Sequence, residues 1–113
     1  MKIAVTSEGP TLDHNIEERF GRWPYLLIID TDTLNFESMK NHNIALGVDP
    51  RRAKSIAEKD VSFILAGNCG STFIRIFEEA GIKVIDRLNG RVMDVVEHFV
   101  SCINPFHLLQ PQR

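Results

Sequence analysis

A glycine-rich loop, Gly67-Asn68-Cys69-Gly70, carries the residue types best suited to chemistry in this sequence. It follows an apolar, strand-like run and precedes a helical pattern that begins at Ser71. Glycines let a backbone approach a ligand closely, and the free N–H groups of a helix start favour an anion. The helix dipole would favour the Cys69 thiolate, which could bind iron or a metallocluster. The alternative interpretation is a tight turn that only joins a strand to a helix.

A polar stretch over residues 11–22 holds the second group of candidates, and His14 lies within it. This stretch follows the first apolar run of the chain, residues 2–6. If the strand over 2–6 runs parallel to a strand over 61–66, the loops after both strands reach one edge of the sheet. His14 and Cys69 would then face the same ligand. A plain surface-loop position is the alternative for each of them.

Two arginines in the same stretch, Arg19 and Arg22, would suit an anionic ligand near a helix N-terminus. Ion pairs with Asp13 or Glu17 are the competing structural interpretation. Catalysis is not predicted, because the sequence has no G-x-S-x-G, H-E-x-x-H, Walker or dinucleotide-binding motif. A two-metal hydrolase is disfavoured because the first strand carries no carboxylate.

The remaining cysteine and the remaining histidines show no metal-ligand pattern. Cys102 has no C-x-x-C partner and is interpreted as structural, on the less apolar side of the last helix. His98 lies beside the apolar stripe of that helix and is interpreted as a boundary residue. The histidines have neither H-x-x-x-H nor H-x-H spacing.

The elements that must position these candidates occur in the order β-β-β-α-β-α-β-α. Apolar runs predict strands over 2–6, 25–30, 35–40, 61–66 and 82–85. Helices are expected from Pro50 to residues 59–60, from Ser71 or Thr72 as the cap to Gly81, and from Asn89-Gly90 to a stop at Pro105. The first part of this order favours a hairpin, and the second part favours parallel βα units. We expect a mixed sheet with helices on both faces.

The length of 113 residues fits one domain, which we place at residues 1–103, followed by a tail over 104–113. A net charge of −2 gives no basic footprint, so nucleic-acid binding is not predicted. No apolar run approaches the roughly 20 residues that span a bilayer. The sequence is therefore interpreted as cytoplasmic, with no membrane partner and reduced cysteines, and as a monomer or weak homodimer.

Several segments together resemble a known family. These are Met1 to Val5, Phe20-Gly21-Arg22, the strand over 25–30, and Ala66 to Gly70 followed by Phe73 and by Ala80 to Val84. They are similar to the dinitrogenase iron–molybdenum cofactor biosynthesis family, which includes NifX-like proteins and the C-terminal domain of NifB-like proteins. The resemblance covers roughly residues 1–100.

The resemblance implies a ribonuclease H-like, three-layer α/β/α fold with a five-stranded mixed sheet. It also implies non-enzymatic binding or carriage of an iron–sulfur or iron–molybdenum-type cluster, or its precursor, together with cofactor-assembly or acceptor proteins as partners. Cys69 and His14 would be the metal ligands. The family commonly has histidine directly before Phe-Gly, and Arg19 stands there in this chain. The alternative function is a metal-free small-anion or nucleotide module that uses the Gly67–Phe73 loop, with Arg19 and Arg22 as further contacts.

Overall fold

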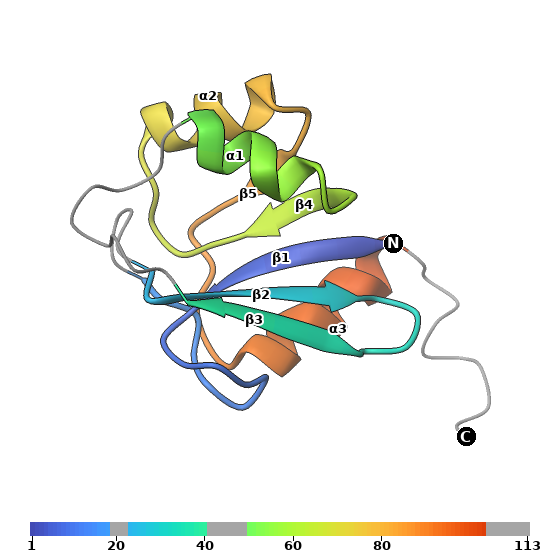
Figure 1. The fold of residues 1–113 in the computed structure, drawn as a ribbon. Helices are drawn as coiled ribbons and strands as arrows, with labels where there is room; N and C mark the ends of the chain where they lie inside the picture. The colour runs from blue at the N-terminus through green and yellow to red at the C-terminus, as the bar shows by residue number, and fades with distance from the viewer. Residues whose placement is uncertain (19–22, 41–49, 104–113) are drawn as a thin grey trace.

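The computed structural model describes residues 1–18, 23–40 and 50–103. Five strands form one sheet in the order β3-β2-β1-β4-β5, and three helices flank it (Figure 1). The strands are β1 (Lys2–Ser7), β2 (Tyr25–Asp30), β3 (Phe36–Lys40), β4 (Val61–Leu65) and β5 (Lys83–Ile85), and the helices are α1 (Pro50–Ala57), α2 (Ser71–Glu79) and α3 (Val92–Ile103). The predicted element order is confirmed.

The pairing of the strands is mixed, as expected from the sequence. β1 and β2 are antiparallel, with Ala4 opposite Ile28, and β3 continues the antiparallel pattern on the other side of β2. β4 is parallel to β1, and β5 is parallel to β4. The carboxyl ends of β1, β4 and β5 therefore meet at one edge of the sheet, which we call the carboxyl edge.

Helices cover both faces of this sheet, which confirms the three-layer arrangement and is compatible with a ribonuclease H-like fold. Figure 1 shows α1 and α2 on one face and α3 on the other. Side chains of β1 alternate between the two layers of core, because successive residues of a strand point to opposite faces. Ala4 packs with Phe77 of α2 in one core cluster, whereas Ile3 and Val5 pack with Phe99 of α3 in the other.

The start of α3 differs from the sequence-based prediction. The helix begins at Val92, not at Asn89-Gly90. Gly90 has a positive φ of 100°, and its carbonyl accepts a 2.8 Å hydrogen bond from the Ile16 N–H. Residues 90–91 are thus bonded to the loop after β1, and the helix can start only beyond them.

Parts of the predicted organisation lie outside the described residues. These are Asp49 as the cap of α1, the loop over 41–47 and the tail over 104–113. Across the described ranges, none of the helices is both long enough and apolar enough to cross a lipid bilayer.

Candidate functional site

The loops after β1 and β4 pack directly against each other at the carboxyl edge. Gly67 is buried, and a Cβ atom at this position would overlap the backbone of Glu17 and Glu18. The Asn68 N–H donates to the Glu18 carbonyl at 3.3 Å. The close approach that we expected of Gly67 is therefore made by the protein's own backbone. The glycine is required for loop packing whether or not a ligand binds.

The segment after β5 holds the other side of the same loop. The Arg87 N–H donates to the Gly67 carbonyl, and the Leu88 N–H donates to the Ala66 carbonyl, both at 3.0 Å. These bonds extend the pairing of β4 with β5 beyond the strand ends. The segments after β1, β4 and β5 are therefore hydrogen-bonded to one another at the carboxyl edge. This arrangement brings Asp86, which directly follows β5, to the loop that contains Cys69.

Cys69 is half-buried, and the Asp86 carboxylate is close enough to act on its ionisation. Its side chain packs against the core between the sheet and helices α1 and α2. Burial, and after it the negative charge of the neighbouring Asp86, together raise the pKa of the Cys69 thiol from 9.0 to about 12. The effect of the helix dipole, which favours a thiolate, is outweighed by these two causes. At neutral pH Cys69 is a protonated thiol.

The start of α2 presents its backbone without a side-chain cap. Gly70, with φ −86° and ψ 172°, is the N-cap and makes no side-chain cap hydrogen bond. Its carbonyl accepts the Ile74 N–H at 3.1 Å. The prediction that Ser71 or Thr72 caps the helix is wrong, because both lie inside the first turn and are exposed. The first N–H groups of a helix have no partner within it, so this end favours an anion.

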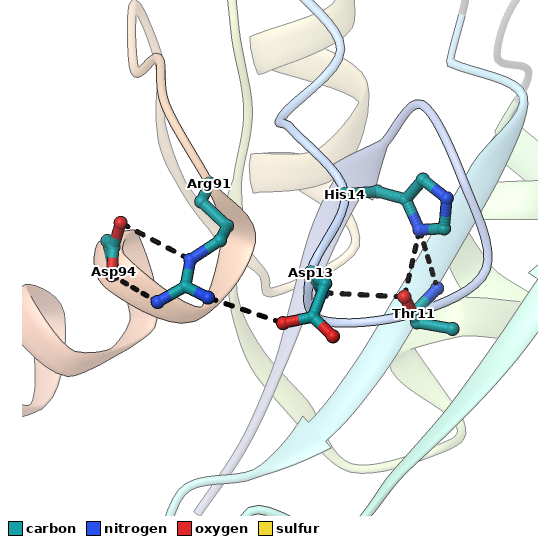
Figure 2. A network of polar contacts seen from close by, with 5 residues as sticks. All are labelled: Thr11, Asp13, His14, Arg91 and Asp94. Carbon is teal, nitrogen blue, oxygen red and sulfur yellow. Dashed lines mark hydrogen bonds and ion pairs between the residues drawn. The ribbon is translucent and has the colours of Figure 1, made fainter.

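His14 contacts its own loop. Its Nδ1 lies 2.9 Å from the Thr11 hydroxyl and accepts a 3.3 Å hydrogen bond from the Thr11 N–H (Figure 2). Its ring also lies over Gly9, where a Cβ atom would overlap it. One ring nitrogen of His14 is therefore already engaged within the loop after β1.

That loop is fastened to the start of α3. The Val92 N–H donates to the His14 carbonyl at 2.9 Å, and the Met93 N–H donates to the Leu12 carbonyl at 3.0 Å. Figure 2 shows Arg91 between the carboxylates of Asp13 and Asp94. Its guanidinium nitrogens lie 3.3 Å from an Asp13 oxygen and 2.9 Å from an Asp94 oxygen. Asp13 therefore pairs with Arg91, which the sequence did not predict, and the predicted pairs with Arg19 or Arg22 lie outside the described residues.

The two predicted metal ligands come from segments that pack against different layers of the core. Leu12 and Ile16, which flank His14, pack with the core beneath α3, whereas Cys69 packs with the core beneath α1 and α2. Among the described residues, no group of three or more His, Cys, Asp and Glu side chains could hold a metal ion. Joint ligation by Cys69 and His14 stays a prediction.

Some of the other predicted site residues lie at the carboxyl edge, and the rest lie outside the residues that the structure describes. Asn68 and Ser71 are exposed, and Gly70 is half-buried. Arg19 and Arg22 lie outside the described residues.

Sequence reasoning missed two polar residues at the carboxyl edge. Asp86 directly follows β5, so the rule that ligands collect beyond parallel strand ends could have included it. Thr6 lies in the last part of β1 with 1 % of its surface exposed, and its hydroxyl has no hydrogen-bond partner within the described residues. A buried hydroxyl without a partner is unusual in a folded protein.

The fold and the carboxyl edge together define a small α/β domain with a half-buried thiol beside an uncapped helix start. The family model described as dinitrogenase iron-molybdenum cofactor matches residues 1–101, and the chain belongs to this family. This confirms the resemblance stated on the sequence. No curated protein matches the chain.

Solved structures agree with this assignment. The apo form of the orange protein from Desulfovibrio gigas is 29% identical, with a TM-score of 0.74 over 89% of this chain and 88% of that one. A Thermotoga protein provisionally designated NifB, of the DUF35 family, is 28% identical, with a TM-score of 0.71 over 88% and 87%. The protein PH0822 shares the fold, with 24% identity and a TM-score of 0.77 over 90% of each chain.

Proposed function

We propose that this protein binds and carries an iron–sulfur or iron–molybdenum-type cluster, or a precursor of one, without catalysing a reaction. The family supports a role in handling this cofactor. The observation that carries the proposal is the half-buried Cys69 thiol, directly before the N-cap Gly70 of α2 and in a loop that is hydrogen-bonded to the segments after β1 and β5. A sulfur ligand and an uncapped row of backbone N–H groups suit an anionic metallocluster.

The number of cysteines favours transient carriage of a cluster over its permanent binding by this protein. Clusters held fully by protein are most often bound by four cysteines, and the chain has two cysteines. Cys69 lies at the carboxyl edge, whereas Cys102 is in the last turn of α3. Figure 1 shows that end of α3 at the opposite edge of the sheet, near the N-terminus. One protein thiol would therefore contact the cluster, and single-point attachment favours release to another protein.

Asp86 would help to keep the Cys69 thiol protonated until a metal ion arrives. With no metal bound, the pKa of about 12, raised by burial and by the Asp86 charge, keeps the thiol protonated. A metal ligand must be deprotonated, so iron would have to displace that proton. The Asp86 carboxylate is the adjacent base that can accept it. Free Cys69 would meanwhile be a poor nucleophile, which protects it from oxidation between loading events.

We infer that the partners are cofactor-assembly or acceptor proteins. Cluster transfer requires a donor and an acceptor, and the family relates to assembly of this cofactor. The exposed residues Asn68, Ser71 and Thr72 surround Cys69 in the sequence and would lie at the contact with such a partner.

Anaerobic reconstitution with iron and sulfide tests the proposal. The wild-type protein should develop sulfur-to-iron charge-transfer absorbance, and Cys69→Ala should not. Cys102→Ala is the matched control, because it removes the other thiol and should retain the absorbance. No absorbance in the wild type, or an unchanged spectrum in Cys69→Ala, would contradict the proposal.

A thermal-shift series with phosphate and nucleotides tests the metal-free alternative. A ligand that binds only the folded state raises the melting temperature. An increase with phosphate, in a protein that takes up no cluster, would favour the anion-binding module instead.

A further inference from the structure

A second thiol and an imidazole lie together on α3, away from the carboxyl edge. The Cys102 Sγ atom is 3.8 Å from the His98 Nε2 atom, and both residues are exposed. They are four residues apart, which places them on one face of the helix, one turn from each other. Neither takes part in the proposed cluster site.

The separation of these two atoms matches one edge of a tetrahedral metal site. With a zinc–sulfur bond of about 2.3 Å and a zinc–nitrogen bond of about 2.0 Å, tetrahedral geometry sets the two donor atoms about 3.5 Å apart. The observed 3.8 Å needs only a small side-chain rotation to reach this value. Because both side chains are exposed, such a rotation meets little packing resistance.

We propose that His98 and Cys102 form half of a zinc site, which the same two residues of a second copy of this chain complete. Structural zinc takes four ligands, and a pair of histidines with a pair of cysteines is a common set. Among the described residues no third His, Cys, Asp or Glu joins this pair to form a metal-binding group. A two-fold axis through the metal supplies the missing pair with identical chemistry.

Charge and surface around the pair fit this arrangement. Two thiolates neutralise one zinc ion, and each thiol releases its proton to solvent on binding, while each imidazole binds in its neutral form. Ile103, next to Cys102, is 44% exposed, so the approach of a second helix would cover an apolar side chain. Soft sulfur and imidazole donors in tetrahedral geometry select zinc over magnesium or calcium.

Sedimentation of the full chain, with and without zinc chloride under reducing conditions, tests the proposal. We expect one zinc ion for two chains and a zinc-dependent dimer. Cobalt(II) in place of zinc should give the visible bands of a tetrahedral site with thiolate ligands. His98→Ala and Cys102→Ser should each abolish the dimer and these bands.

The chain provides matched controls for both substitutions. Cys69→Ser and His14→Ala remove the same side-chain types elsewhere and should retain the zinc-dependent dimer. A dimer that persists in Cys102→Ser, or one zinc ion bound per monomer, would overturn the proposal. Since both α3 residues are exposed, an unchanged melting temperature without metal shows that the variants fold. The zinc readout is also separate from cluster uptake, which requires Cys69.

Discussion

The groups around Cys69 shift the pKa of its thiol in opposite directions, and the larger effect decides its protonation state. A helix start favours the thiolate by about 0.3–1 kcal/mol, which is less than one pKa unit. Burial and Asp86 act the other way and raise the pKa from 9.0 to about 12. The second effect is larger, so the position of a cysteine at a helix N-terminus is not sufficient to make it reactive.

Replacing Asp86 with asparagine should lower the pKa of Cys69 toward 9.0, because the substitution removes the charge that opposes the thiolate. Burial would remain and keep part of the shift. The pKa can be measured from the pH dependence of alkylation in a Cys102→Ser background, where Cys69 is the only thiol. Asp32→Asn, at an exposed carboxylate, should leave the pKa unchanged. An unaltered titration in Asp86→Asn would refute the role assigned to Asp86.

Gly67→Ala should destabilise the fold by about 1–3 kcal/mol, as expected for overpacking a tight contact. The added methyl group would overlap the backbone of Glu17 and Glu18, which cannot rotate away. Gly9→Ala is an informative comparison, because its methyl group would meet the His14 side chain instead. Urea denaturation should show the larger loss for Gly67→Ala. Equal stability of the two variants would show that the loops at the carboxyl edge can shift to accommodate the methyl group at little cost in free energy.

At the scale of elements, two kinds of contact fasten the loop after β1 to α3. Backbone bonds join Ile16 to Gly90 and His14 to Val92, and the Ile16 side chain is fully buried. Arg91 adds ion pairs to Asp13 and Asp94, whose side chains are 84% and 63% exposed. Exposed ion pairs contribute little to stability, so the buried contacts should dominate.

Arg91→Ala should therefore lower the free energy of unfolding by less than about 1 kcal/mol. Ile16→Ala should lower it by about 2–5 kcal/mol, because it leaves a cavity in the core beneath α3. Chemical denaturation of both variants measures the two losses. An Arg91→Ala loss as large as that of Ile16→Ala would mean that the ion pairs hold the loop.

The same elements show why some boundaries could not be predicted from sequence. Strand and helix types follow from local patterns of apolar residues, and all eight elements were predicted in order. The start of α3 depends instead on Ile16 bonding to Gly90, a contact 74 residues away along the chain. The cap of α2 is Gly70, one residue before the predicted Ser71, and residue preference alone favoured the serine.

At the scale of the whole molecule, the sequence was sufficient to predict that the loops after β1 and β4 share one edge of the sheet, but not which side chains surround Cys69 there. Parallel pairing of β1 with β4 brings their loops to one edge, as predicted. The partner of Cys69 depends on β5 lying beside β4, which places Asp86 at the same edge. A thiol's pKa reflects such three-dimensional neighbours, and no local pattern around Cys69 contains them.

The raised pKa of Cys69 also links its ionisation to the stability of the whole fold. Below pH 9 the thiol is protonated in both the folded and the unfolded chain, so it adds no pH dependence. Between pH 9 and about 12 the unfolded chain loses the proton first, which favours unfolding. The free energy of unfolding should therefore fall with rising pH more steeply in the wild type than in Cys69→Ser.

Urea denaturation at a series of alkaline pH values measures this difference, and the serine variant cancels the titration of lysine and tyrosine side chains common to both proteins. Cys102→Ser should follow the wild type, because its thiol is exposed in the folded chain. Parallel curves for the wild type and Cys69→Ser would mean that Cys69 ionises as easily in the folded chain as in the unfolded one. Cluster loading would then need no proton transfer to Asp86, and the thiol would be reactive before metal arrives.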